Sequence, residues 1–260
     1  MEIISFVLLG VIAGFFAGLL GVGGGIVTVP VMSLILLPYL GFSTEHIMHV
    51  AVASSLAAII PTSIMSAYGH HRQGGVVWPV ALQLTPGLLV GALFGALFVS
   101  SIDASSLQFS FAIFLFFVAL YMFFSPQSWI KSVAGGMKAF PLVSVPIGFL
   151  SSIMGVGGGT MTVPYLLWRG LDIRKAIGIS AFCGLPIAFI ASVTFYTLQK
   201  SGEGQAVDFL YMPAVLGISI GSIFFAPIGA KFTHIFPVLT IKRLFSLLLI
   251  VASAKLLGFF

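Results

Sequence analysis

The sequence predicts an all-α polytopic membrane protein built from two inverted-topology repeats, each a Gly-rich helical hairpin followed by three transmembrane helices. Three observations predict this fold: the composition is hydrophobic, the apolar residues form long runs, and the second half repeats the first. Hydrophobic residues make up 59% of the 260 residues and charged residues 7%, against about 25% charged residues in soluble domains. So few charges cannot cover a water-facing surface. Unbroken apolar runs also argue against a β-barrel, whose strands alternate apolar and polar residues.

Ten apolar segments follow one another along the chain. They span residues 3–20, 26–40, 46–68, 78–99, 106–124, 139–154, 159–170, 174–199, 207–229 and 242–258. A helix needs about 20 residues to cross the hydrocarbon core of a bilayer. Segments 46–68 and 78–99 reach that length, whereas 26–40 and 159–170 look short. We therefore expect each short segment to be the second arm of a broken or re-entrant hairpin.

An internal repeat divides the chain into two halves. Three matches occur in the same order: residues 21–30 with 155–164, residues 51–61 with 176–186, and Gly87 and Gly91 with Gly217 and Gly221. Because the order is kept, the pattern indicates a duplication and not chance glycine richness. The polar stretch 125–138 is then the linker between a first repeat, 1–124, and a second repeat, 139–260.

The distribution of Lys and Arg predicts how the halves are oriented. If the first two segments of each half formed one broken crossing, the two membrane faces would carry five and six cations. If they form a hairpin that enters and leaves on one face, nine cations share a side, as the positive-inside rule requires. These are Arg72, Lys131, Lys138, Arg169, Arg174, Lys175, Lys231, Lys242 and Arg243, with Lys200 and Lys255 opposite. We therefore expect inverted repeats, both termini outside the cytoplasm and the linker inside.

Two Gly-rich turns between apolar helices are the candidate binding site. Unpaired backbone amides are costly in hydrocarbon, so the amides of these turns need a partner. A following helix points its positive N-terminal end at each turn, and amides plus dipole suit an anion without any Lys or Arg. The candidate residues are Gly21, Val22, Gly23, Gly24, Gly25, Thr28, Gly155, Gly157, Gly158, Gly159, Thr160 and Thr162. The alternative is that these glycines only permit close helix packing, which also explains pairs such as Gly14 and Gly18.

Four further polar residues inside apolar segments are candidate contacts to the anion. Ser54, Ser55 and Ser180 precede Pro61 and Pro186 by one to two helical turns, so they either face the anion or satisfy carbonyl groups freed by the prolines. Gln83 either contacts the anion or bridges helices. Histidines near residues 46 and 70 fall on opposite membrane faces in this topology, which disfavours a metal site, and His49 alone lies deep enough to be linked to a proton.

These motifs resemble those of the sulfite exporter TauE/SafE family. The likeness rests on the paired Gly-Val-Gly-Gly-Gly turns followed by Thr-x-Pro, and on the Ala-x-x-x-Ser segment in each half. It covers nearly the whole chain. The resemblance implies a membrane carrier for small sulfur-containing anions such as sulfite or sulfoacetate-like organosulfonates. The two half-sites differ, because the Ser54-Ser55 pair becomes Ile179-Ser180 in the second half.

The leading functional prediction is therefore a secondary transporter in the cytoplasmic membrane that exports such an anion. The alternatives are a passive anion channel, or a carrier for another small anion or a metal. We expect no enzyme, because no nucleophile with its base and no metal-ligand set is visible. We expect no cofactor and no nucleic-acid partner, since the cations form no basic stripe. The expected partners are the anion and the lipid bilayer, and the sequence leaves open whether the chain forms a homodimer.

Overall fold

The computed structural model describes residues 2–124, 140–201, 209–233, 235 and 238–258, and these residues are helical throughout apart from short connections. The first half contains α1 (Glu2–Leu20), α2 (Gly25–Val31), the π-helical η1 (Met32–Leu36), α3 (Leu37–Tyr39), α4 (Ile47–His71), α5 (Trp78–Val99) and α6 (Ala104–Phe124). The second half contains α7 (Phe140–Ile153), α8 (Gly159–Trp168), α9 (Ile173–Ser201), α10 (Met212–Phe232) and α11 (Val238–Leu256). The expected linker, 125–138, lies outside the described residues.

The described helices confirm a multi-pass membrane protein. Six of them, α1, α4, α5, α6, α9 and α10, are long and apolar enough to cross a bilayer. The two segments that look short in the sequence are short as helices. Residues 25–39 form three consecutive elements and α8 has 10 residues. At about 1.5 Å per residue, neither reaches the thickness of about 30 Å that a hydrocarbon core requires.

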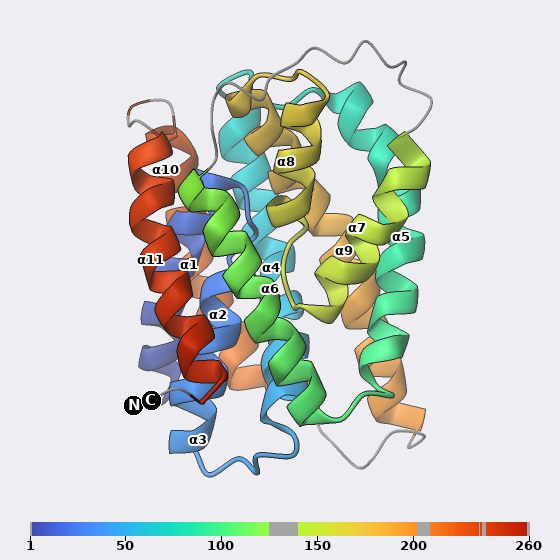
Figure 1. The fold of residues 1–260 in the computed structure, drawn as a ribbon, viewed down its shortest axis with the longest axis vertical. Coiled ribbons are helices and arrows are strands. Elements are labelled where there is room, and N and C mark those ends of the chain that lie inside the picture. Colours follow the sequence, from blue (N-terminus) through green and yellow to red (C-terminus); the bar gives the residue numbers. More distant parts are fainter. Residues whose placement is uncertain (1, 125–139, 202–208, 234, 236–237, 259–260) are drawn as a thin grey trace.

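The first helix of each half packs on the fourth segment of the other half. Helix α1 lies along α10, and α7 lies along α5 (Figure 1). Glycines allow both contacts, as the small-residue alternative predicts for these positions: a Cβ atom at Gly14 would come within 2.5 Å of the Cα atom of Ser222, and one at Gly91 would overlap the carbonyl oxygen of Val145. Both pairs run parallel, because contacts advance together along the two helices of each pair.

Helices α4 and α9 form the centre of the bundle and run in opposite directions. Gly178 near the start of α9 lies against His70 at the end of α4, and Gly184 further along α9 lies against Ser63. Both helices are largely buried. They are the helices that carry the repeated segments 51–61 and 176–186. Two matching segments thus meet antiparallel at the core.

The described charges separate between the two ends of the bundle. One end, called the cationic end, holds Arg72, Arg169, Arg174, Lys175, Lys231 and Arg243, together with Asp172. The opposite end holds the beginnings of α1, α4, α6 and α10, with the charges of Glu2, Glu45, Asp103, Lys200 and Lys255 (Figure 1). This separation is the one that the hairpin topology predicts for the described residues. Lys131, Lys138 and Glu203 lie outside them.

Candidate functional site

The two Gly-rich turns lie directly against each other inside the bundle. A Cβ atom on Gly23 would come within 2.6 Å of the Cα atom of Gly157, and one on Gly157 would come within 2.8 Å of the Cα atom of Gly23. Residues 21–30 and 155–160 are all buried. Gly24 and Gly158 have φ values of +85° and +66° and precede the first residues of α2 and α8, a left-handed conformation that glycine adopts without strain.

Each turn is held by a serine from the other half of the chain. The Ser180 hydroxyl donates to the carbonyl of Gly21 at 2.9 Å, and the Ser55 hydroxyl donates to the carbonyl of Gly155 at 3.0 Å. Both acceptors are the first glycine of their turn, and both donors occupy matching positions in the repeated segments. The structure therefore brings Ser55 and Ser180 to the turns. These bonds satisfy backbone carbonyls across the interface between the halves.

The turns differ in which hydrogen-bond donors they leave unused. In the first turn, residues 22–25 have no recorded backbone acceptor for their amides, whereas Gly158 in the second turn donates to Val156 at 2.9 Å. The threonines behave in the opposite way. Thr28 is hydrogen-bonded to Ser55 at 2.6 Å, but Thr160 and Thr162 are buried with no partner for their hydroxyls. Among the described residues, the first turn thus offers amides, and the second offers the two threonine hydroxyls together with the amide of Gly157, which also has no backbone acceptor.

In this conformation the space between the turns is closed. The pocket that touches both of them, beside Val22, Gly159 and Thr160, has a volume of about 20 Å³, enough for a single water molecule. Close packing is therefore a sufficient reason for Gly23, Gly25, Gly157 and Gly159. It does not explain the unpaired hydroxyls of Thr160 and Thr162, since buried polar atoms normally have partners.

Two other candidate residues lie away from the turns. Ser54 accepts a hydrogen bond from the amide of Tyr211 at 2.9 Å and so holds the segment before α10. Gln83 lies half-buried on α5 with its side-chain oxygen buried and unpaired. No recorded hydrogen bond joins either side chain to a glycine turn.

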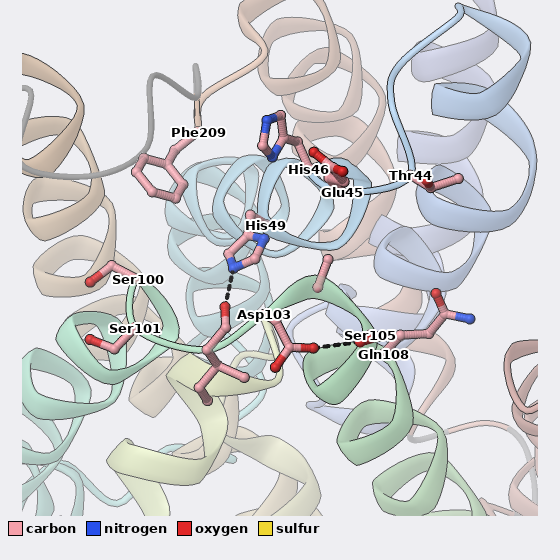
Figure 2. Close-up of a pocket in the computed structure, with 12 residues that line it drawn as sticks. Thr44, Glu45, His46, His49, Ser100, Ser101, Asp103, Ser105, Gln108 and Phe209 are labelled. Atoms are coloured by element: carbon pink, nitrogen blue, oxygen red, sulfur yellow. Dashed lines mark hydrogen bonds between the residues drawn. The ribbon is translucent and has the colours of Figure 1, made fainter.

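A cavity of about 700 Å³ opens at the end of the bundle opposite the cationic end, and the sequence does not predict it (Figure 2). Its walls come from the start of α4, the connection between α5 and α6, and the segment before α10. The lining includes Glu45, His46, His49, Ser101, Asp103 and Phe209. The isolated position of His49 in an apolar segment is the one signal in the sequence that points here. The cavity itself depends on contacts between distant segments.

Hydrogen bonds fix two of the lining residues. His49 places Nε2 2.9 Å from the carbonyl oxygen of Ile102 (Figure 2). Asp103 accepts hydrogen bonds from the Ser105 hydroxyl and, at 2.9 Å, from the Ser106 amide. These bonds, above all the one from Ser105, hold the pKa of the Asp103 carboxyl well below its usual range, so this side chain is negatively charged near neutral pH. Within the described part of the chain, no group of three or more His, Cys, Asp or Glu could hold a metal ion.

The cavity and the second glycine turn contact α4 at positions about one helical turn apart. A Cβ atom on Gly155 would lie 3.0 Å from the Cα atom of Val52, three residues along α4 from His49. Three residues of a helix span about 4.5 Å. The polar cavity and the buried turns are thus neighbours.

Comparison with known proteins gives a consistent result. A family model described as "Sulfite exporter TauE/SafE" matches residues 6–256. A probable membrane transporter protein of Haemophilus influenzae is 36% identical over 259 residues, which cover 96% of each chain. A probable membrane transporter protein of Methanocaldococcus jannaschii is 28% identical, covering 86% of this chain and 84% of the relative. A third, YdhB of Bacillus subtilis, is 28% identical over 96% of each chain. No solved structure matches.

Proposed function

The chain belongs to the sulfite exporter TauE/SafE family, and on that premise we propose that it is a secondary carrier that exports small sulfur-containing anions, such as sulfite or organosulfonates, across the cytoplasmic membrane. The observation that supports this most is the meeting of two buried turns that both leave hydrogen-bond donors unused. Amides of residues 22–25 and the hydroxyls of Thr160 and Thr162 are neutral donors. Neutral donors and a helix N-terminus stabilise an oxyanion yet let it leave more readily than a buried cation would.

We also propose that the halves are inverted repeats with the cationic end in the cytoplasm. The antiparallel packing of the matching helices α4 and α9 supports the inversion. So does the exchange of partners, in which α1 packs on α10 as α7 packs on α5. The positive-inside rule supports the orientation. Inverted repeats meeting at mid-membrane binding turns occur in several transporter folds.

Transport requires the two turns to separate, because a sulfur oxyanion is far larger than the space between them. The hydrogen bonds from Ser55 and Ser180 are the contacts that must break or shift on one side when this happens. Two hydrogen bonds contribute about 1 kcal/mol each, which is compatible with reversible opening. The proposal predicts a carrier whose flux saturates and shows counterflow, whereas an open channel would conduct in proportion to voltage.

A thermal-shift screen in detergent tests the substrate class. Sulfite, sulfoacetate, taurine, thiosulfate and sulfate would each be added to the purified protein, with chloride at matched ionic strength as the control. An anion present at 100 times its Kd stabilises the folded form by about 2.7 kcal/mol, so at least one sulfur-containing anion should raise Tm by several degrees. If none of the five raises Tm above the chloride control and none supports counterflow in proteoliposomes, the proposed function is wrong.

The driving force can be tested separately. An inside-negative potential favours exit of an anion by about 2.3 kcal/mol per charge per 100 mV, so a uniporter needs no coupling ion. We expect efflux of the anion identified in the screen to rise when a potassium gradient with valinomycin makes the proteoliposome interior negative. Efflux that stays the same over clamped potentials would contradict uniport of a net negative charge.

A further inference from the structure

The cavity opposite the cationic end takes no part in the function as proposed above. We propose that it is the outer vestibule of the anion pathway, and that Glu45 and Asp103 lower the affinity for the anion at this face. The anion then leaves after crossing instead of binding again. This proposal rests on the proposed function, because it concerns the exit of the same anion.

The inner wall of the cavity contains an unpaired polar atom. His49 is 8% exposed, and its Nδ1 is buried with no hydrogen-bond partner. Nε2 lies 2.9 Å from the carbonyl oxygen of Ile102, to which it can donate when it carries the proton of the neutral ring. The polar lining therefore continues inward to His49.

The cavity lies close to the second glycine turn. His49 is one helical turn from Val52, which packs on Gly155. The Phe209 ring, which also lines the cavity and is 3% exposed, packs against His49 with ring centroids 6.2 Å apart. Ser54, next to Ser55, holds the segment that carries Phe209 through the amide of Tyr211. A movement that shifts this segment would join the cavity to the second turn.

The charge of the cavity is opposite to that of the other end. Its described lining has the carboxyl groups of Glu45 and Asp103 and the imidazoles of His46 and His49, with neither Lys nor Arg. The offset of 125 residues places Arg174, at the start of α9, in the position matching His49 at the start of α4. The matching region at the cationic end thus carries Arg174, with Lys231 in the last turn of α10. A cationic entrance raises the local concentration of an anion, and an acidic exit lowers it.

These fixed charges change the affinity at each face without driving net transport, because the overall equilibrium depends on concentration and membrane potential alone. The expected effect is therefore an asymmetry of KM between the two faces. It should depend on salt, since the Debye length is about 30 Å at 10 mM and about 8 Å at 150 mM ionic strength.

Cysteine labelling tests the vestibule without requiring transport. The single native cysteine, Cys183, is fully buried, so Ser101→Cys supplies a thiol in the cavity on a silent background. Membrane-impermeant methanethiosulfonates carrying either a sulfonate or a trimethylammonium group would be applied from outside. With Glu45→Gln and Asp103→Asn added, the rate for the sulfonate reagent should rise relative to the trimethylammonium reagent by about fivefold at 10 mM salt. Asn caps a helix as well as Asp, so α6 should keep its start.

Glu2→Gln is the matched control, because Glu2 lies at the same end but does not line this cavity. It should leave the ratio of labelling rates unchanged. A thiol at position 101 that does not react from outside, or a ratio that the double neutralisation leaves unchanged, overturns the proposal.

A transport measurement separates this inference from the proposed function. In proteoliposomes that counterflow sulfite, the double variant should lower KM at the outer face about threefold at 10 mM salt and less at 150 mM. Absence of sulfite counterflow by the unmodified protein counts against the proposed function. Intact counterflow with an unchanged outer KM overturns the vestibule proposal alone.

Discussion

Replacing Gly159 with alanine should destabilise the folded protein and impair transport. An added Cβ atom would overlap the carbonyl oxygen of Gly21 and lie 2.6 Å from the Cα atom of Val22. Both neighbours are backbone atoms of the other turn, so no side chain can rotate to make room. In an ordinary helix, alanine in place of glycine gains about 0.5–1 kcal/mol. Here overpacking, which costs about 1–3 kcal/mol or more, reverses the sign. Gly25→Ala should behave alike, because its Cβ atom would overlap the carbonyl oxygen of Gly155.

The measurements are Tm in detergent, monodispersity on gel filtration and counterflow in proteoliposomes. Gly74→Ala is the control, since Gly74 has φ +69° but no atom within 4 Å of the added Cβ atom. It carries the cost of a left-handed residue, about 1–2 kcal/mol, without any clash, so transport should persist. If Gly159→Ala has the Tm and flux of the unmodified protein, the turns are not in the contact described above.

The long apolar runs predict the membrane-crossing helices because a helix must be long and apolar to cross the hydrocarbon core. The segment expected at 78–99 is α5 with the same bounds, and that expected at 106–124 begins two residues late. The repeat matches Ser55 with Ser180, and in the structure both hydroxyls bind the other half's turn. Neither interpretation of these serines predicted that they would bind the carbonyl groups of Gly155 and Gly21, because each carbonyl lies more than 90 residues away in the sequence. The cavity could not be predicted from the sequence either, because Glu45, Asp103 and Phe209 lie in three separate connections that meet only in the folded protein.

Thr162→Val should weaken binding of the anion without destabilising the folded protein. Thr162 is fully buried and its hydroxyl has no partner, so replacing that hydroxyl by a methyl group removes no hydrogen bond of the folded protein. Tm should stay the same or rise, because an unsatisfied buried polar group is lost. If the hydroxyl donates to the anion, a charged hydrogen bond of about 1.5–3 kcal/mol disappears. KM for the transported anion should then rise about tenfold to hundredfold.

The matching residue in the first half, Thr28, provides the control and should respond in the opposite way. Ser55 donates to the carbonyl of Gly155, so Thr28 is the donor in the 2.6 Å bond between Thr28 and Ser55. Thr28→Val therefore removes an internal bond and should lower stability by about 1 kcal/mol, with a smaller effect on KM. A structural role for both threonines would instead make the two variants equally destabilising and leave KM alone. In that case Thr28 and Thr162 would differ in their hydrogen bonds but not in their function. The anion would then have to be held by backbone amides of the turns.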